Sequence, residues 1–390
     1  MNIALVRGPF TNAWEAQNFL PLADRHRITV FSTYGAMFSS REVPLRQVRL
    51  FAPETPLAVC SRNAATVFNK VLNRLVGADL HLFGLGSRLR GMDVVHTMEL
   101  YHTFTGQVLA AARRYGFPVV VTVWENIPFT YERHPVRRAV KERTRREAAL
   151  FIAPSGSTRD MLLMEGVPPE RIVVQPMGID VSRFGGAPRD ETFARSLGAL
   201  EADATVLFVG RLVWEKGVYE LVHAARLVAD AAAARGRRVR VLLAGAGPER
   251  PALQREIVRL GLERVVVFCG MISYRDMPRL FALADVFALP SIPLRWWREQ
   301  FGYVLVEALA AGVPVVSTAT GAIPEVVGGA GVIVPPADHR ALADALWGLL
   351  DDPHRRELLA RAARSRAEEV YDVRKVAHAL ERLYERALAR

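Results

Sequence analysis

The chain has 390 residues, of which 51% are hydrophobic, and its 51 basic and 40 acidic residues give a formal net charge of +11. This length and composition exclude a disordered protein and predict two or three domains with packed cores. The two cysteines, Cys60 and Cys269, are too few for a disulfide framework and match no zinc-ligand spacing, which favours a reducing compartment.

The N-terminal segment and the hydropathy of the chain bear on its location. The segment MNIALVRGPF reaches Arg7 after a short apolar stretch, which is too short for the apolar region of a signal peptide. The longest uncharged run, between Glu307 and Glu325, is interrupted by Gly312 and Pro314, so no segment is predicted to span a membrane. We therefore expect a cytoplasmic protein.

Arginine supplies almost all of the positive charge, because only Lys70, Lys141, Lys216 and Lys375 are lysines. So uneven a ratio is typical of a genome-wide coding bias and favours an arginine-solvated surface. A sequence-independent nucleic-acid-binding surface is the alternative. The sequence contains no nucleic-acid module pattern, and its aromatic residues do not alternate with basic ones, so we expect no nucleic-acid partner.

Short aliphatic segments alternate with segments of helical spacing along the whole chain, which is typical of a parallel sheet built from βα units. In the first half, the predicted strands are residues 3–6, 28–31, 94–96, 119–123, 151–153 and 172–175. In the second half, they are residues 205–209, 239–244, 265–269, 286–289 and 315–317. Strands of this composition are expected to be buried on both faces.

The turn PMGID at residues 176–180 marks the predicted domain boundary, since glycines and a proline interrupt the periodicity after it. We expect residues 1–180 and 181–372 to form two doubly wound, Rossmann-like α/β domains whose parallel sheets face a central ligand cleft. Residues 373–390 have an apolar helical stripe and are predicted to pack back on the first domain.

The first candidate for ligand chemistry is GRLVWEKGVYELVHAA, residues 210–225, which runs from a predicted strand into a helix that begins near Gly217. Its loop offers Arg211 and Lys216 beside a helix N-terminus, an arrangement that binds anions. In a chain that uses arginine almost throughout, a lysine favours a phosphate site, because a compact ammonium suits that ligand. The alternative is that both cations are solvated loop charges.

The second candidate is REQFGYVLVEALAAGVPVVST, which places Glu299 in a loop and Glu307 inside a helix. Eight residues of helix rise about 12 Å, comparable to the reach from the ribose of a sugar nucleotide to its sugar. Glu307 is then expected to bind ribose hydroxyls and Glu299 the hydroxyls of the sugar. The residues predicted to begin the helix, with N–H groups that face a diphosphate, are Phe301, Gly302, Tyr303 and Val304. An ordinary helix with one surface acid is the alternative.

Asp-x-Asp pairs, which hold a divalent cation at a leaving diphosphate, do not occur in the sequence. An enzyme without that metal needs fixed positive charge instead. Arg211, Lys216 and the predicted helix N-terminus would supply it. We therefore expect metal-independent chemistry and no cofactor.

Several separated motifs occur in one order: PMGID, GRL with EKG, LPS, EQFGYVLVE and GAIPEVV. In this order they resemble the retaining glycosyltransferases of family 4, which adopt the two-domain GT-B fold. The resemblance covers nearly the whole second domain. It implies that the chain is a hexosyltransferase whose donor is a nucleoside-diphosphate sugar, UDP- or GDP-linked.

The resemblance also assigns roles to individual residues of the second domain. It implies that Arg211 and Lys216 hold the donor diphosphate and that Glu299 contacts the donor sugar, which makes these three the catalytic candidates. It further implies that Glu307 binds the ribose. The remaining implied contacts, with the base, come from Gly270 and Met271.

The first domain departs from the family pattern at two places. The glycine-rich loop that follows the first strand in the family is reduced to Gly8 in RGPFTNAWE. At the end of VVVTVWENIPF the family often has a histidine near the reacting carbon, where this chain has Trp124 followed by Glu125 and Asn126. We expect Trp124 to stack on a sugar ring and Glu125 to contact donor or acceptor, with core filling as the alternative for Trp124.

Two histidines and one basic segment also bear on the predicted site and on the location of the protein. His96 and His102 are near the predicted cleft, but an ordinary structural role is favoured for each. Residues 133–146 hold seven basic residues and one acid, and their helix is predicted to present Arg137, Arg138, Lys141 and Arg145 on one face. A solvated charged face is favoured there, with peripheral contact to an anionic membrane as the alternative.

These features together predict an enzyme that moves a hexose from a nucleoside-diphosphate sugar to an acceptor hydroxyl with retention at the anomeric carbon. The acceptor is a glycan, a glycolipid or a small molecule. Two alternatives stay open. A nucleotide-sugar epimerase shares the fold, and a non-catalytic subunit would keep the fold to support a partner transferase.

Overall fold

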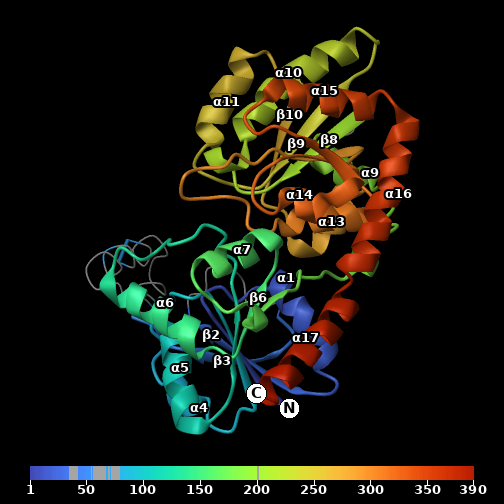
Figure 1. Ribbon diagram of the computed structural model, residues 1–390. Coiled ribbons are helices and arrows are strands. Elements are labelled where there is room, and N and C mark those ends of the chain that lie inside the picture. The colour runs from blue at the N-terminus through green and yellow to red at the C-terminus, as the bar shows by residue number, and fades with distance from the viewer. Residues whose placement is uncertain (35–42, 54, 56–66, 69–70, 72–79, 200–201) are drawn as a thin grey trace. The chain divides into compact units, whose positions relative to one another are not determined.

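The computed structural model describes the chain except residues 35–42, 54, 56–66, 69–70, 72–79 and 200–201, so Cys60 and Lys70 lie outside the described residues. It divides into two compact units (Figure 1). Unit 1 comprises Met1–Gly178 and Val373–Arg390, and unit 2 comprises Ile179–Asp372. The division follows Gly178, whereas the boundary predicted from the PMGID turn follows residue 180.

Unit 1 is built on a seven-stranded sheet in the order β3-β2-β1-β4-β5-β6-β7, in which every neighbouring pair is parallel. The strands are β1 (Asn2–Gly8), β2 (Arg27–Thr33), β3 (Arg46–Leu50), β4 (Val94–Met98), β5 (Val119–Thr122), β6 (Leu150–Ala153) and β7 (Ile172–Val174). All but β3 are predicted from the sequence. β3 is an edge strand whose two arginines are exposed, so it lacks the apolar run on which the prediction rests.

The central strands of unit 1 are buried along their whole length, because helices cover both faces of a doubly wound sheet. The helices are α1 (Ala13–Ala16), η1 (Gln17–Leu22), α4 (Leu85–Arg88), α5 (Thr103–Tyr115), α6 (Pro135–Glu147), α7 (Gly156–Met164), η2 (Pro169–Arg171) and α17 (Val373–Leu388). The C-terminal helix α17 packs on η1, and its buried Tyr384 hydroxyl lies 2.7 Å from Nδ1 of His96 on β4. Residues distant in sequence thereby complete the core of unit 1.

Unit 2 has a six-stranded parallel sheet in the order β10-β9-β8-β11-β12-β13. The strands are β8 (Ala204–Val209), β9 (Val239–Ala244), β10 (Val266–Gly270), β11 (Val286–Leu289), β12 (Val315–Thr318) and β13 (Gly331–Val334). The sequence predicts all except β13, a four-residue edge strand. The prediction of two doubly wound parallel α/β domains is confirmed.

The helices of unit 2 flank its sheet. They are α8 (Val181–Phe184), α9 (Glu191–Ser196), η3 (Trp214–Lys216), α10 (Val218–Ala233), α11 (Arg250–Arg259), η4 (Tyr274–Asp276), α12 (Met277–Phe281), α13 (Tyr303–Ala311), α14 (Ile323–Val327), η5 (Gly328–Ala330), α15 (His339–Leu350) and α16 (Pro353–Val370). In both sheets the strand order reverses beside the first strand, between β1 and β4 and between β8 and β11. Ligands of such folds bind beyond the carboxyl ends of the strands at this reversal.

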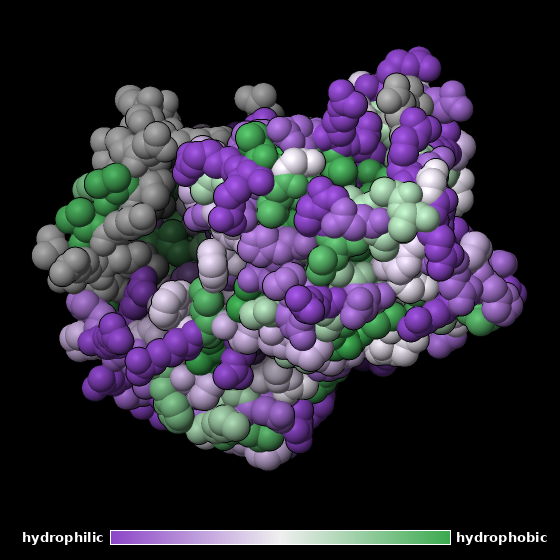
Figure 2. All heavy atoms as spheres, turned by 90° about the horizontal axis from the view of Figure 1, so that it is seen from above, coloured by the Kyte–Doolittle hydropathy of each residue, from purple (hydrophilic) through white to green (hydrophobic). Residues whose placement is uncertain are grey.

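On the face shown in Figure 2, hydrophilic side chains dominate and hydrophobic ones are scattered among them, as is usual for a surface in contact with water. Among the residues that the structure describes, no helix combines the length and apolar character needed to cross a bilayer.

Candidate active site

The loops at the carboxyl edge of the unit 2 sheet are in close backbone contact through glycines. A Cβ atom on Gly217 would lie 1.8 Å from the carbonyl oxygen of Pro290, so the loop after β8 rests directly on the loop after β11. A Cβ atom on Gly321 would lie 2.0 Å from the carbonyl oxygen of Glu299. Both glycines also have positive φ, at +65° and +54°. Only glycine fits such positions, so this edge has a fixed backbone geometry.

Lys216 and Glu299 meet on that fixed backbone. Nζ of Lys216 lies 2.6 Å from Oε2 of Glu299, and the hydroxyl of Ser291 donates to the same oxygen at 2.9 Å. The ammonium also lies 4.8 Å from the centroid of a Trp297 ring, within range of a cation–π interaction. The structure thus brings together a lysine and a glutamate that are 83 residues apart in sequence.

Arg211 lies on the same loop as Lys216 but in a different environment. Its side chain is 66% exposed and forms an ion pair with Glu215 at 3.2 Å. Exposed ion pairs of this kind contribute little to stability. The guanidinium can therefore leave Glu215 for a ligand at small cost.

The helix that carries the second glutamate begins later than predicted. α13 begins at Tyr303, with Gly302 at φ +80° as its N-cap residue. Phe301 precedes the helix, and its buried ring packs against Tyr303 and Tyr371. The prediction that Phe301 and Gly302 begin the helix is wrong, because the left-handed conformation of Gly302 cannot continue into it. Tyr303 and Val304 are the first helical residues.

Glu307 is buried within α13, and burial raises the pKa of its carboxyl to about 7. Arg183 and a hydrogen bond from Tyr274 act in the opposite direction and lower that pKa. The guanidinium of Arg183 also lies 4.8 Å from the centroid of the Tyr274 ring. Sequence reasoning missed both residues, although Arg183 follows the PMGID turn closely.

Gly270 and Met271 lie at the end of β10. Gly270 has φ +69°, and the register with β9 shifts just before it, so the chain turns sharply out of the sheet. Met271 is 77% exposed, which is unusual for so apolar a side chain. Both residues therefore lie at the carboxyl edge of unit 2, as do Lys216 and Glu299.

In unit 1, Gly8 is the last residue of β1 and Trp124 follows β5, the two strands that flank β4. Gly8 ends β1 at φ +52°, and a Cβ atom there would lie 3.3 Å from the ring of Phe104. Trp124 is half-buried and packs against the core of unit 1. Its backbone N–H donates to Oε1 of Glu99 at 3.0 Å. The indole thus has both a packed and an exposed part.

Two buried carboxyl groups lie beside each other at this edge. Glu125 accepts hydrogen bonds from the N–H groups of Asn126 and Ile127 at 2.9 and 3.0 Å, and burial raises the pKa of its carboxyl. Burial and the neighbouring Glu125 together raise the pKa of Glu99 to about 8. Sequence reasoning missed Glu99, since nothing in the segment HTMELYH marks it as buried.

Comparisons with known proteins decide the family. Residues 203–352 match a family model described as Glycosyl transferases group 1, and residues 22–183 match one described as Glycosyltransferase Family 4. The MMP alpha-(1->4)-mannosyltransferase of Mycolicibacterium hassiacum is 30% identical over 326 residues, which are 78% of this chain and 73% of that protein. This chain belongs to the glycosyltransferases.

Other relatives and solved structures agree with this assignment. The 2-deoxystreptamine glucosyltransferase of Streptomyces kanamyceticus is 29% identical over 305 residues, 75% of this chain and 76% of that protein. Anabaena HepE in complex with UDP-glucose superposes with a TM-score of 0.75 at 20% identity, over 99% of this chain and 100% of that one. Sucrose-phosphate synthase from Thermosynechococcus elongatus gives a TM-score of 0.74 at 20% identity, over 100% of both chains. The glycosyltransferase has the GT-B fold.

The two histidines of this glycosyltransferase that neighbour the candidate site differ in their surroundings. His96 is fully buried between the Tyr384 and Thr122 hydroxyls, both at 2.7 Å, and burial and Arg7 hold its pKa well below the usual range. It therefore has the structural role that was favoured. His102 stacks on Phe10 with ring centroids 5.2 Å apart, and burial lowers its pKa to about 3.

The basic segment of the glycosyltransferase is neutralised in part. Lys141 on α6 is only 1% exposed, and its ammonium pairs with Glu165 and, at 3.3 Å, with Glu132. Arg145 pairs with the same two acids at 3.2 and 3.4 Å. The prediction that Lys141 and Arg145 share a solvated basic face with Arg137 and Arg138 is therefore wrong.

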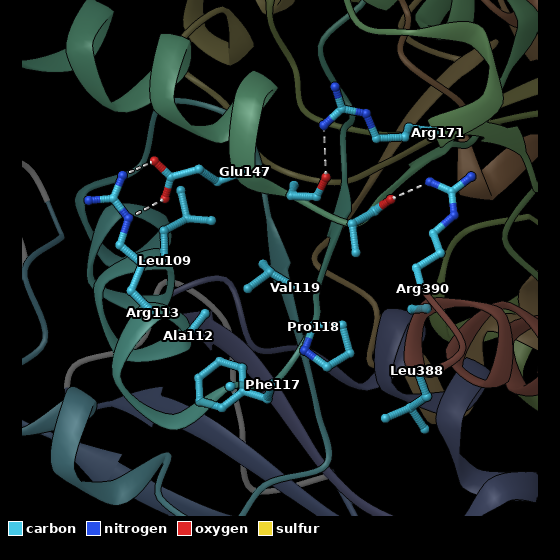
Figure 3. A pocket seen from close by; sticks show the side chains of 14 residues that line it. Leu109, Ala112, Arg113, Phe117, Pro118, Val119, Glu147, Arg171, Leu388 and Arg390 are labelled. Atoms are coloured by element: carbon cyan, nitrogen blue, oxygen red, sulfur yellow. Dashed lines mark hydrogen bonds and ion pairs between the residues drawn. The ribbon is translucent and has the colours of Figure 1, made fainter.

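A hollow of about 600 Å³ lies at the opposite edge of the unit 1 sheet (Figure 3). Val119, the first residue of β5, lines it, so it lies at the amino end of the strands rather than at the carboxyl end where such folds bind ligands. Figure 3 shows its arginines already engaged: Arg113 with Glu147, and Arg171 and Arg390 with backbone carbonyl groups. We therefore do not assign it to the transferase site.

Proposed function

We propose that this glycosyltransferase moves a hexose from a nucleoside-diphosphate sugar to an acceptor hydroxyl with retention at the anomeric carbon. The observation that carries the proposal is the contact of Lys216 with Glu299 at the carboxyl ends of β8 and β11. The cation proposed for the diphosphate, Lys216, therefore donates a hydrogen bond directly to Glu299, the carboxylate proposed for the sugar hydroxyls. Two relatives are named a mannosyltransferase and a glucosyltransferase, which supports a hexose.

The donor is proposed to lie along the carboxyl edge of unit 2. Lys216, Arg211 and the N-terminal end of α13 neutralise the diphosphate, which carries the charge that develops when the sugar leaves. Glu299 binds hydroxyls of the sugar, Glu307 binds the ribose, and the turn at Gly270 and Met271 lies against the base. A UDP or GDP donor is proposed, and Anabaena HepE was solved with UDP-glucose.

In the proposed reaction, the bond from the anomeric carbon to the diphosphate oxygen breaks and a bond from that carbon to the acceptor oxygen forms on the same face. The acceptor proton passes to an oxygen of the leaving diphosphate. No side-chain nucleophile is needed. When the donor binds, the ammonium of Lys216 must contact the phosphate in addition to Glu299 or in place of it. Substitution of either residue should therefore change the affinity for the donor.

Metal independence is part of the proposal. The sequence offers no Asp-x-Asp pair, and the fixed cations described above replace the charge of a metal ion. Transfer rates are expected to survive excess EDTA. Complete loss of activity that Mg²⁺ or Mn²⁺ restores would contradict this part of the proposal.

Unit 1 is proposed to bind the acceptor, with Gly8, Trp124 and Glu125 near the reacting groups, and the enzyme to act in the cytoplasm. Peripheral contact with an anionic membrane is also proposed. It rests on the exposed side chains of Phe129, Arg133, Val136 and Arg138, which are close in sequence, and the buried Lys141 has no part in it. Co-sedimentation with anionic but not neutral vesicles, lost at high salt, is the expected result.

A thermal-shift screen against UDP, GDP, ADP and their sugar conjugates tests the proposed donor class. Selective binding at 100 times Kd stabilises the fold by about 2.7 kcal/mol, which raises Tm measurably. Incubation of the protein with the stabilising sugar nucleotide, without acceptor, distinguishes a transferase from an epimerase. An isomerised nucleotide sugar would support the epimerase. A chain that binds no nucleotide and never turns over a donor would support the non-catalytic subunit.

A further inference from the structure

Glu99 has a backbone conformation that needs explanation. It follows β4 directly and has φ +58°, in the left-handed region that side chains other than glycine rarely adopt. Its N–H donates to the carbonyl of Thr122 on β5 at 2.9 Å, and its carbonyl accepts from the hydroxyl of Thr105 on α5 at 3.1 Å. Neighbouring elements therefore hold a strained residue in place, which is typical of functional sites.

The side chain of Glu99 is directed at the turn that follows β5. Oε1 accepts the backbone N–H of Trp124 at 3.0 Å, and the N–H of Glu125 also hydrogen-bonds to this carboxyl. Oε2 is buried and has no hydrogen-bond partner in the part of the chain that the structure describes. One carboxyl group thus holds the two residues that are proposed to face the substrates.

Glu99 forms no ion pair with any residue that the structure describes. Burial and the Glu125 carboxyl on the β5 turn raise its pKa, and the Lys141 ammonium on α6 lowers it. Burial, and to a smaller extent Glu99, in turn raises the pKa of the Tyr101 and Tyr131 hydroxyls. Lys141 is already paired with Glu165 and Glu132. Two buried carboxyl groups so placed disfavour a second negative charge, because burial and the Glu125 anion raise the pKa of Glu99.

We propose that Glu99 is a positioning residue for sugar transfer. Its uncharged carboxyl fixes the turn at Trp124 and Glu125 to the end of β4 and leaves Glu125 as the single negative charge of the pair. This inference rests on the proposed function, which places Trp124 and Glu125 against the substrates. Ionisation of Glu99 would repel Glu125 and displace the turn, so transfer is sensitive to alkaline pH through a residue that does not touch the substrate.

Glu99→Gln and Glu99→Ala test this inference, with Glu381→Gln on α17 as the matched control. Glu381 is also a buried acid of unit 1, and it pairs with His26 at 2.7 Å. kcat and KM are measured from pH 6 to 9.5 for all variants. Hydrogen exchange of the Trp124 and Glu125 amides is measured by mass spectrometry on the full chain.

The glutamine keeps the acceptor oxygen and cannot ionise. Glu99→Gln is therefore expected to keep kcat within about twofold at pH 7 and to lose the fall in kcat that the wild type shows above pH 8. Glu99→Ala meets the same backbone strain without the carboxyl, so kcat should fall about tenfold or more with little change in the donor KM, and the two amides should exchange faster. Glu381→Gln is expected to keep the wild-type pH profile.

The inference is overturned if Glu99→Gln shows the alkaline fall of the wild type, or if Glu99→Ala keeps both its kcat and its amide protection. If Glu99→Ala fails to fold, the pH profile of Glu99→Gln decides. A wild type that transfers no sugar contradicts the proposed function instead. The exchange measurement then still decides whether Glu99 holds the turn.

Discussion

The carboxyl edges of the two sheets differ in the charged groups that they bring together. In unit 2, a lysine and a glutamate pair directly on a backbone that glycines hold in close contact. In unit 1, the carboxyls of Glu99 and Glu125 interact without an ion pair to either among the residues that the structure describes, and positive φ values occur at Glu99, Phe129 and Tyr131. The edge of unit 2 is proposed to bind a diphosphate, a ligand of constant chemistry. The edge of unit 1 is strained and is proposed to face the acceptor.

The largest effect is expected at the paired cation of unit 2. Lys216→Ala removes the cation proposed for the diphosphate and takes the ammonium away from the buried Glu299. Loss of a charge-assisted hydrogen bond costs about 1.5–3 kcal/mol, so kcat/KM for the donor should fall about 10- to 100-fold. Steady-state kinetics measure the fall. Lys375→Ala, at an exposed lysine of α17, is the control and should behave as wild type; an equal loss there would discredit the assignment.

Arg211→Ala should have a smaller effect than Lys216→Ala. The guanidinium is exposed and pairs only with Glu215 among the described ion pairs, so solvent screens whatever it contributes to the diphosphate. A loss of kcat/KM of about tenfold is expected, and it should shrink as salt is raised. A larger loss than that of Lys216→Ala would mean that Arg211 contributes more to donor binding than Lys216.

Glu307 is expected to make the free energy of unfolding depend on pH. Burial raises the pKa of Glu307 to about 7 in the folded chain, above its value in an unfolded chain. The folded state therefore binds the proton more tightly, so the stability from this group is complete below about pH 4.5 and is lost as pH rises towards 7. Urea unfolding of the wild type and Glu307→Gln from pH 4.5 to 8 should show a steeper decline for the wild type. Parallel curves would mean that Glu307 has an ordinary pKa.

The smallest effect on donor binding is expected at Trp124. Its indole cannot accept a hydrogen bond, so its proposed role is stacking and exclusion of water. Trp124→Phe should retain most transfer, whereas Trp124→His should raise donor hydrolysis relative to transfer. If both variants differ from wild type only in melting temperature, Trp124 fills core space and has no part in the reaction.

The sequence could predict candidate residues that lie in local motifs, but not residues whose contacts come from distant parts of the chain. Lys216 and Glu299 could be named as candidates because each lies in a local motif in the loop that follows a buried strand, and their roles stay predictions. Glu99 could not, since its proposed role comes from contacts with Trp124, which follows the next strand. The placement of Lys141 on a solvated basic face was wrong for a similar reason: one of the two acids that pair with it is Glu165, 24 residues away.

Secondary structure follows the same rule. The central strands and the edge strands β7 and β10 were found from their aliphatic runs. The edge strand β3 was missed because polar and charged residues interrupt its apolar ones, whereas β13, GVIV, has an aliphatic run that was overlooked. The start of α13 was misplaced by two residues, since the sequence does not show that Gly302 adopts φ +80°. Local composition therefore predicts the layers of this fold better than the ends of its elements.

The most direct test of the account is calorimetric titration of UDP and GDP into the wild type, Lys216→Ala and Glu99→Ala. The account places the nucleotide diphosphate on unit 2 alone. One nucleotide should therefore bind the wild type and Glu99→Ala with the same affinity, and Lys216→Ala about tenfold or more weakly. Equal affinity for all three proteins, or a loss confined to Glu99→Ala, would contradict the assignment of the donor site.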